Sequence, residues 1–317
     1  DYRPRWCVVQ EKYALTGEPN FFSDTLQAHS GLMNQIRHQF EAIRPETYRK
    51  VRHLSEGEDV DLDAGIDALI DLRSGVTPDD DVYWRRNKIE RDVGVVFLLD
   101  MSASTAEAVE EVRRNPEWDM PNDPTAYAAW LRARRTESGR RQYKRIIDVE
   151  KESMVLLMTA LEIIGDRYGV YGFSGFGREN VEFYVIKDID EQLSERVKSR
   201  LDKVAPLHAT RMGPAIRHAT MKLDRVAAKT KFLFVISDGR PQDRGYSREG
   251  VEKEYAVEDT HMALIEAKLK DITPFCLTVD RQGHDYLRTM AGDMGYEVLP
   301  DIMELPRRLP YLYRRLT

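Results

Sequence analysis

The chain has 317 residues, with 48 Lys and Arg against 54 Asp and Glu, which gives a formal net charge of -6. This length suits one large α/β domain with a smaller attachment, and the mildly acidic balance excludes nucleic acid and anionic membrane as default partners. No apolar stretch approaches the roughly 20 residues that span a bilayer, and no secretory signal is evident. Because two cysteines, Cys7 and Cys276, are too few for a disulfide framework, we expect a cytoplasmic protein.

Residues 1–92 are expected to form a small, mainly helical extension that packs on the domain after it. Its elements are a strand near residues 6–10 and helices at residues 24–43 and 61–72. The last helix is acidic and amphipathic, and its apolar side chains recur at helical spacing: Leu62, Ile66, Leu69 and Ile70. A separate core is not expected here, since the apolar content is modest.

A nearly continuous apolar run from Val93 to Leu99 predicts a strand that is buried on both faces. Asp100, Ser102 and Ser104 follow it at alternate positions. These residue types also cap helices, and Asp-x-Ser-x-Ser alone is a weak pattern. Other segments of the chain must therefore show whether these three residues cap a helix or bind a metal.

Strands and helices then alternate to the end of the chain. Strands are predicted at residues 169–173, 181–186, 231–237, 273–279 and 296–299, and helices at residues 146–165, 191–204, 214–228, 258–270, 286–291 and 302–313. Such alternation is typical of a doubly wound, mostly parallel sheet in an α/β domain, here residues 93–317. A glycine-rich connection near residues 172–177 predicts a hairpin, which places one antiparallel edge strand on the sheet.

Five side-chain oxygens are predicted to gather at one edge of this sheet. Asp238 ends a second apolar strand, and Thr210 lies in a loop just before a helix. Since ligands of open parallel sheets bind outside the carboxyl ends of the strands, these residues should face one crevice. The candidate metal ligands are Asp100, Ser102, Ser104, Thr210 and Asp238.

Hydroxyls and carboxylates in this number suit Mg²⁺, with Mn²⁺ as an alternative, and they suit Ca²⁺ less well because it takes more ligands at longer distances. Two carboxylates balance the charge of the ion. Three of the five ligands are neutral, however, so the ion keeps affinity for a further anionic oxygen. A Glu or Asp of another protein would supply it.

The five residues resemble the metal-ion-dependent adhesion site (MIDAS) of von Willebrand factor type A (VWA) domains, whose pattern is Asp-x-Ser-x-Ser, a distant Thr and a later Asp. The resemblance covers about residues 93–317 and implies a Rossmann-like fold. It also implies that the last coordination position takes a carboxylate from a partner protein.

One departure from that family is a long connection at residues 105–145, between the Asp-x-Ser-x-Ser loop and the next helix. It contains the aromatic residues Trp118, Tyr127 and Trp130, then a basic run of Arg132, Arg134, Arg135, Arg140, Arg141, Lys144 and Arg145. One interpretation is a solvated helical hairpin or loop. The other is a second contact surface for an acidic partner.

Further segments narrow the resemblance to the NorD/CbbO group of bacterial VWA proteins: residues 84–87, 146–152, 171–175, 211–213 and 237–241. Members of that group resemble adaptors for MoxR-type AAA+ ATPases. CbbO works with the CbbQ ring to remove inhibitory sugar phosphates from rubisco, and NorD is linked to activation of nitric oxide reductase. The chain is therefore expected to be the carboxyl-terminal part of a CbbO adaptor with rubisco as its client, and the alternative is a NorD-type adaptor.

The expected adaptor is not itself an enzyme, and its sequence has no Gly-x-x-x-x-Gly-Lys-Ser/Thr phosphate loop, so the partner ring would hydrolyse ATP. Two readings of other classes stay open. A Mg²⁺-dependent phosphatase is disfavoured because Ser102 stands where such enzymes carry their second acid. A structural module, in which the metal only stabilises the loop, would bind metal without recognising a partner.

Overall fold

The computed structural model describes residues 6–18, 20–42, 48–88, 92–109, 144–239, 241–243, 252–278 and 284–317. Most of the connection at residues 105–145, for which a solvated hairpin or loop and a second contact surface were both open, lies outside these ranges, including its three aromatic residues and the basic run up to Arg141. The chain divides into two compact units, one made of Asp1–Phe40 with Asp92–Thr317 and the other of Glu41–Arg91. Each is described by itself.

The larger unit is built on a seven-stranded sheet in the order β1-β7-β6-β5-β8-β9-β10. Its strands are β1 (Val9–Tyr13), β5 (Val93–Asp100), β6 (Arg167–Gly175), β7 (Val181–Lys187), β8 (Thr230–Ser237), β9 (Ile272–Thr278) and β10 (Gly295–Val298). All neighbouring pairs are parallel except β6 and β7. This confirms the doubly wound, mostly parallel α/β fold and its antiparallel hairpin. Outside β7, however, lies β1, which pairs with it in parallel from Val9 and Val181 onward and forms the sheet's edge.

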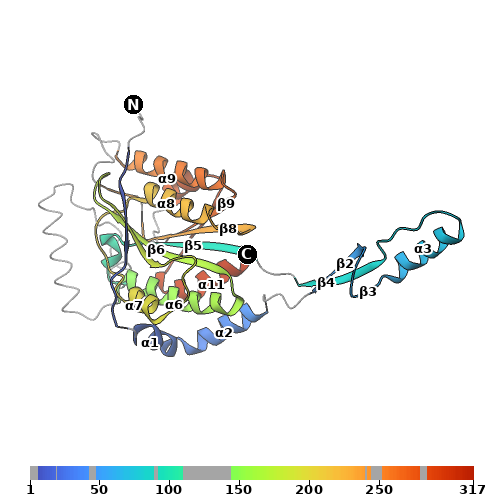
Figure 1. Ribbon diagram of the computed structural model, residues 1–317. Helices are drawn as coiled ribbons and strands as arrows, with labels where there is room; N and C mark the ends of the chain where they lie inside the picture. Colours follow the sequence, from blue (N-terminus) through green and yellow to red (C-terminus); the bar gives the residue numbers. More distant parts are fainter. Residues whose placement is uncertain are drawn as a thin grey trace, which may run out of the picture. The chain divides into compact units, whose positions relative to one another are not determined.

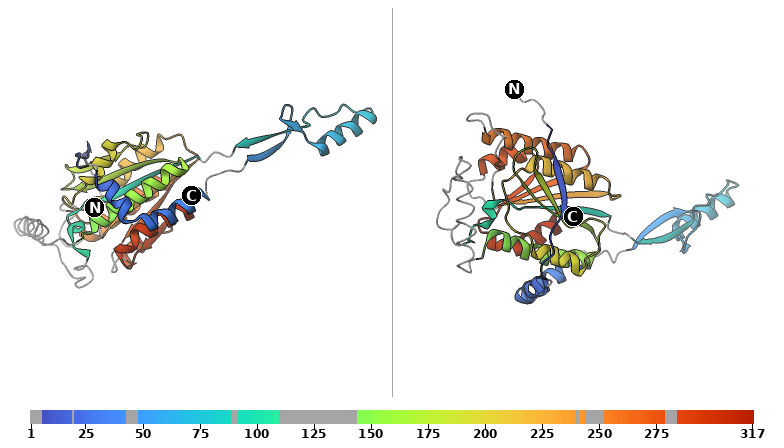
Figure 2. Two further views of the ribbon diagram at one scale, coloured as in Figure 1. Left: turned by 90° about the horizontal axis from the view of Figure 1, so that it is seen from below. Right: turned by 60° about the vertical axis from the view of Figure 1, so that its left-hand side comes forward.

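Helices cover both faces of this sheet (Figures 1 and 2). One layer contains α1 (Asn20–Ala28), α2 (Ser30–Glu41), α6 (Ile146–Ile164), α7 (Glu195–Asp202) and α11 (Leu305–Leu316), and the other α8 (Met212–Asp224), α9 (Glu252–Lys268) and α10 (His284–Ala291). Two short 3₁₀ helices, η1 (Ala103–Ala106) and η2 (Ile302–Glu304), follow β5 and precede α11. Alternate side chains of β5 enter separate cores, with Phe97 on the α6 side and Leu98 on the α8 side. This explains why the strand reads as continuously apolar. Across the described residues, no helix combines the length and the apolar character that a membrane span requires.

Local signals fix the ends of α6, the long helix beneath β5. At its start the Asp148 carboxylate accepts a hydrogen bond from the Arg145 backbone N–H at 3.1 Å, which satisfies a donor that the helix leaves unpaired. At its end Gly165 has φ of 78°, a left-handed conformation that side chains disfavour, and its N–H donates to Leu161. The N–H of Ile146, the first residue of α6, donates to the carbonyl of Glu107 just after η1, so the helix begins next to the Asp-x-Ser-x-Ser loop.

The expected extension of residues 1–92 is divided between the two units. Its first part belongs to the larger unit, because β1 pairs within the main sheet and Phe22, Met33 and Phe40 join the main core. In the remainder, which is the smaller unit, the strands pair only with one another among the described residues. It contains an antiparallel sheet in the order β2-β4-β3, from β2 (Tyr48–Leu54), β3 (Asp59–Val60) and β4 (Tyr83–Lys88), and one helix, α3 (Leu62–Arg73). The expected mainly helical extension is thus wrong for this part.

Helix α3 carries its large apolar side chains on an exposed stripe. Asp61 begins the helix and accepts a hydrogen bond from the Asp63 backbone N–H at 3.4 Å. No residue of α3 is buried, and Ala64 and Ala68 are half-buried. The exposed stripe is formed by Leu62, Ile66, Leu69 and Ile70, which retain 55–77% of their accessible surface.

Cys276 gives a direct chemical test of this core. It lies in β9, is 4% exposed, and burial raises the pKa of its thiol to about 12. Because the thiolate is the reactive form, we expect iodoacetamide at pH 8 to modify half-buried Cys7 and to leave Cys276 intact until the chain is unfolded. Mass spectrometry of the labelled peptides measures both sites. Equal labelling of the two thiols in the folded protein would contradict the placement of β9.

Candidate metal site

The candidate site lies at the carboxyl ends of two neighbouring parallel strands. Asp100 is the last residue of β5 and Asp238 follows the last residue of β8, and the pairing of Leu99 with Ile236 brings these ends to the same edge. Ser104 lies in η1, directly after β5. Thr210 lies in the loop that leads into α8. The sheet therefore places all five predicted residues at one edge.

Hydrogen bonds join four of these five side chains in a chain of contacts. The Ser102 backbone N–H donates to Asp100 Oδ1 at 2.9 Å, and the Ser102 and Ser104 hydroxyls lie 2.8 Å apart. The Ser104 hydroxyl then donates to Asp238 Oδ1 at 3.0 Å. Two carboxylates and two hydroxyls thus share one small polar region, as a hard cation requires.

The Asp100 carboxylate is also held by residues from two other segments. The Ser237 hydroxyl donates to Asp100 Oδ2 at 2.7 Å, and the side chain of Thr210 also hydrogen-bonds this carboxylate. Thr210 is thereby brought to the other four residues as the sequence predicted. Ser237 was missed, although its position directly before Asp238 at the end of an apolar strand could have indicated it.

The backbone of the site loop is fixed by the neighbouring segments. Met101 donates its N–H to Phe173 at 2.8 Å, and its carbonyl accepts the N–H of Leu207 at 2.7 Å. The Ala103 N–H donates to the His208 carbonyl at 2.7 Å. These bonds restrain the loop, which reduces the conformational entropy lost when an ion binds.

A buried ion pair braces the Thr210 loop. Arg211 Nη1 donates to Asp243 Oδ2 at 2.7 Å, and both side chains are almost fully buried. Asp243 also accepts the Gly177 backbone N–H, at 2.9 Å and 3.1 Å to its two oxygens. Thr210 and Gln242 exchange two backbone hydrogen bonds of 2.9 Å and 3.0 Å. This pair thus ties the loop that carries Thr210 to the β6–β7 turn.

The surroundings of Asp100 and Asp238 disfavour the charged forms of both carboxyl groups. Asp100 is fully buried, and this burial raises its pKa to about 6 despite the hydrogen bonds from Ser237 and Ser102. Desolvation and then the charge of Asp100 hold the pKa of half-buried Asp238 well above its usual range. In the part of the chain that the structure describes, no ion pair gives either carboxylate a cationic partner.

A third acid, Glu150, was missed by the sequence reasoning. It lies on α6, is 1% exposed, and neither of its carboxylate oxygens has a hydrogen-bond partner among the described residues. Burial, then the charges of Asp238 and Asp100, raise its pKa well above the usual range. The sequence holds part of the signal, because Ile146 and Ile147 stand four and three residues before Glu150 and so share its helix face. The lack of a partner for Glu150 appears only in the fold.

The donor set fits a divalent cation of the Mg²⁺ type. Within the described residues, no three His, Cys, Asp or Glu side chains converge to form a metal cluster, so any ion at this edge depends on the hydroxyls as well as the carboxylates. Hydroxyl and carboxylate oxygens are ligands for hard cations, and the lack of His and Cys disfavours zinc. The residues that would hold the ion are the five predicted from the sequence.

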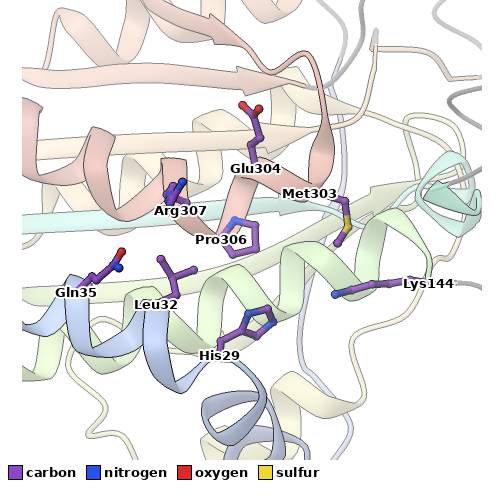
Figure 3. A pocket seen from close by; sticks show the side chains of 8 residues that line it. All are labelled: His29, Leu32, Gln35, Lys144, Met303, Glu304, Pro306 and Arg307. Atoms are coloured by element: carbon purple, nitrogen blue, oxygen red, sulfur yellow. The ribbon is translucent and has the colours of Figure 1, made fainter.

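A separate hollow lies between α2 and the start of α11 (Figure 3). Its volume is about 300 Å³, and it is lined by His29, Leu32, Gln35, Lys144, Met303, Glu304, Pro306 and Arg307. None of the five site residues lines it. Its mixed charges and open shape do not suggest a particular ligand.

Fold and site together define an α/β domain with a polar, acid-rich binding edge. No family model matches the chain. It is 31% identical to Protein NorD of Brucella melitensis over 315 residues. These aligned residues cover 99% of this chain and 44% of that protein. An uncharacterised protein of Pseudomonas aeruginosa is 31% identical over 281 residues, which cover 89% of this chain and 40% of that protein. The chain thus spans less than half the length of these curated relatives.

The fold also recurs in a solved structure of distant sequence. The PilB minor pilin of Streptococcus sanguinis superposes with a TM-score of 0.51 at 13% identity, covering 74% of this chain and 63% of that one. This likeness supports the fold and carries no functional argument.

Proposed function

We propose that this chain is a metal-dependent adaptor module. Asp100, Ser102, Ser104, Thr210 and Asp238 hold Mg²⁺, or Mn²⁺ in its place, and the open coordination position takes a Glu or Asp of a client protein. The ion supplies charge for this contact. The chain's own residues shape the site, exclude other ligand types and orient the open position.

The observation that carries this proposal is the meeting of two desolvated carboxylates with three hydroxyls at one strand edge, without a described cationic partner. Buried charges of one sign are costly unless paired or bound to metal. The surrounding hydroxyls can neither neutralise them nor saturate a divalent ion. A bound cation therefore relieves the like charges and still attracts one more anionic oxygen.

The relatives favour a NorD-type client over rubisco. The sequence predicts a CbbO adaptor, but the Brucella melitensis relative reported above, which matches 99% of this chain, is named NorD. The client of this module is accordingly a nitric oxide reductase complex. Coupling to a MoxR-type AAA+ ATPase, cytoplasmic action and the absence of enzymatic activity belong to the same proposal.

The test is a binding measurement with purified components. The chain is immobilised and titrated with nitric oxide reductase, and in parallel with rubisco, in Mg²⁺ and again after chelation with EDTA. We expect binding of the reductase in Mg²⁺ and a loss of at least tenfold in affinity after chelation, because the carboxylate contact needs the ion. Asp238→Asn should reproduce the loss while Mg²⁺ is present.

The matched control is Asp224→Asn, which changes an exposed acid at the end of α8, away from the site. It should bind as the unchanged chain does. Equal binding of the reductase with and without metal would overturn the metal contact, and preferential binding of rubisco would restore the CbbO-type assignment. Metal binding without capture of either client would favour the purely structural module.

A further inference from the structure

Glu150 is a fully buried acid near the site that the five-residue pattern does not include. Its two carboxylate oxygens are buried and have no hydrogen-bond partner among the described residues. A buried acceptor without a donor costs free energy, so such groups usually meet a protein donor, a water or an ion. After burial itself, the charges that raise the pKa of Glu150 are those of Asp238 and Asp100.

The start of α6 explains why Glu150 reaches this region. Ile146 donates its N–H to the Glu107 carbonyl at 3.1 Å, and Val109 donates to the Lys144 carbonyl at 2.9 Å. These bonds fasten the first turn of α6 to the segment that follows η1. Glu150 lies in the next turn of the helix, on a buried face.

We propose that Glu150 takes part in metal binding through water: it accepts hydrogen bonds from water molecules that the ion holds. This extends the proposed metal site beyond its five residues and rests on that site. Direct ligation is disfavoured because no three acidic side chains converge among the described residues. Metal-bound waters are donors, and they supply what both orphaned oxygens lack.

Glu150→Gln tests this role because the amide keeps the size and loses the charge. Titration calorimetry with Mg²⁺, and electron paramagnetic resonance with Mn²⁺, should show metal affinity reduced about 10- to 100-fold. Losses of this size are typical when a residue that hydrogen-bonds to a metal-coordinating group is changed. The metal-free variant should unfold at the same or a higher temperature, since one buried like charge is removed. Glu150→Asp keeps a carboxylate on a shorter side chain, so its metal affinity should lie between those of the unchanged chain and Glu150→Gln.

The control is Glu162→Gln on the same helix, where the carboxylate accepts the Tyr168 hydroxyl at 2.7 Å and takes no part in the site. It should leave metal affinity unchanged. Unaltered affinity in Glu150→Gln would overturn the proposal without touching the five-residue site. If metal binds neither variant nor the unchanged chain, the proposed site itself fails.

A second inference rests on the exposed stripe of α3, formed by Leu62, Ile66, Leu69 and Ile70. A helix in a globular unit normally turns its apolar stripe inward. Here the small side, with Ala64 and Ala68, is half-buried instead. An exposed apolar patch of this kind marks an interaction surface.

The charges beside the stripe specify the partner. Asp63, Asp67 and Asp71 recur every four residues along α3, so they form an acidic row next to the stripe. Residues 55–81 contain ten acids and one basic residue, Arg73. A complementary surface is therefore an apolar groove with Lys and Arg along its rim.

We infer that α3 docks into such a groove on the ATPase ring that the proposed function requires. The metal site and α3 belong to different compact units, so one chain can hold a client with the first and the ring with the second. The acidic row speeds encounter with a basic rim, and the apolar stripe provides the bound area. This inference rests on the coupling to an ATPase proposed above.

Two variants separate the two surfaces. Ile66→Ser with Leu69→Ser should reduce binding of the purified cognate MoxR-type ATPase at least tenfold and leave Mg²⁺-dependent client binding intact. Asp238→Asn should do the reverse. Both α3 positions are more than half exposed, so the fold should survive, which circular dichroism checks.

Light scattering tests whether the stripe of α3 binds a second copy of this chain instead of the ring. A fall from dimer to monomer in the α3 variant would overturn the ring contact in favour of a second copy of the chain. Unchanged ATPase binding by the α3 variant would also overturn it. If the unchanged chain does not bind the ATPase at all, the proposed coupling fails together with this inference, while client binding still reports on the metal site.

Discussion

Asp243→Ala is expected to destabilise the chain by about 3–5 kcal/mol, because it leaves the Arg211 guanidinium buried without its carboxylate. The same change removes the acceptor of the Gly177 N–H. Since this ion pair braces the loop that carries Thr210, metal affinity should fall as well. Urea unfolding measures the first effect, and calorimetric titration with Mg²⁺ measures the second.

A double variant, Arg211→Met with Asp243→Leu, is the control for this prediction. Replacing both charges by apolar side chains of similar size is often close to neutral for stability. We therefore expect most of the free energy of unfolding to return in the double variant. A loss as large as that of Asp243→Ala alone would show that packing or the Gly177 contact, and not the orphaned charge, causes the destabilisation.

Saturating Mg²⁺ is expected to raise the free energy of unfolding by about 2.7 kcal/mol at 100 times its dissociation constant. Asp100→Asn should abolish most of this gain because it removes a ligand charge. Without metal, the same variant should be at least as stable as the unchanged chain, since Asp100 is buried beside Asp238. Thermal unfolding at pH 7.5, with Mg²⁺ or with EDTA, measures both effects.

Asp224→Asn, which changes an exposed acid, should keep the full response to Mg²⁺. A response of the same size in Asp100→Asn would show that the ion binds elsewhere. A response lost in both variants would point to a general effect of charge on the chain. Only the opposite behaviour of the two variants supports a site built on Asp100.

Much of the larger unit was predictable because its signals are local. The apolar runs of β5 and β8 and the helix signals of α6 read directly as elements, and strand ends in a parallel sheet meet at one edge. The convergence of Asp100, Thr210 and Asp238 follows from that topology. The hydroxyl contacts between Ser102, Ser104 and Asp238 then follow from proximity.

The remainder depends on contacts between distant segments. Glu150 reads as one acid of a helix, and its isolation appears only when α6 is placed under β5. The pairing of Arg211 with Asp243 joins two loops and has no periodic signal. The division of the first 92 residues could not be read either, because β1 finds its partner in β7 and the large apolar side chains of α3 remain exposed.

The edge strand β1 has a consequence for synthesis of the chain. Val9 emerges from the ribosome long before Val181, its partner in β7, so β1 has no place in the sheet until β7 has been made. Closing so long a loop is entropically costly and slow. From the synthesis of β7 until β1 has docked, the outer side of β7 is an unpaired edge that can recruit a strand from another nascent chain. When the chain misfolds, we therefore expect exchange of β1 between two copies.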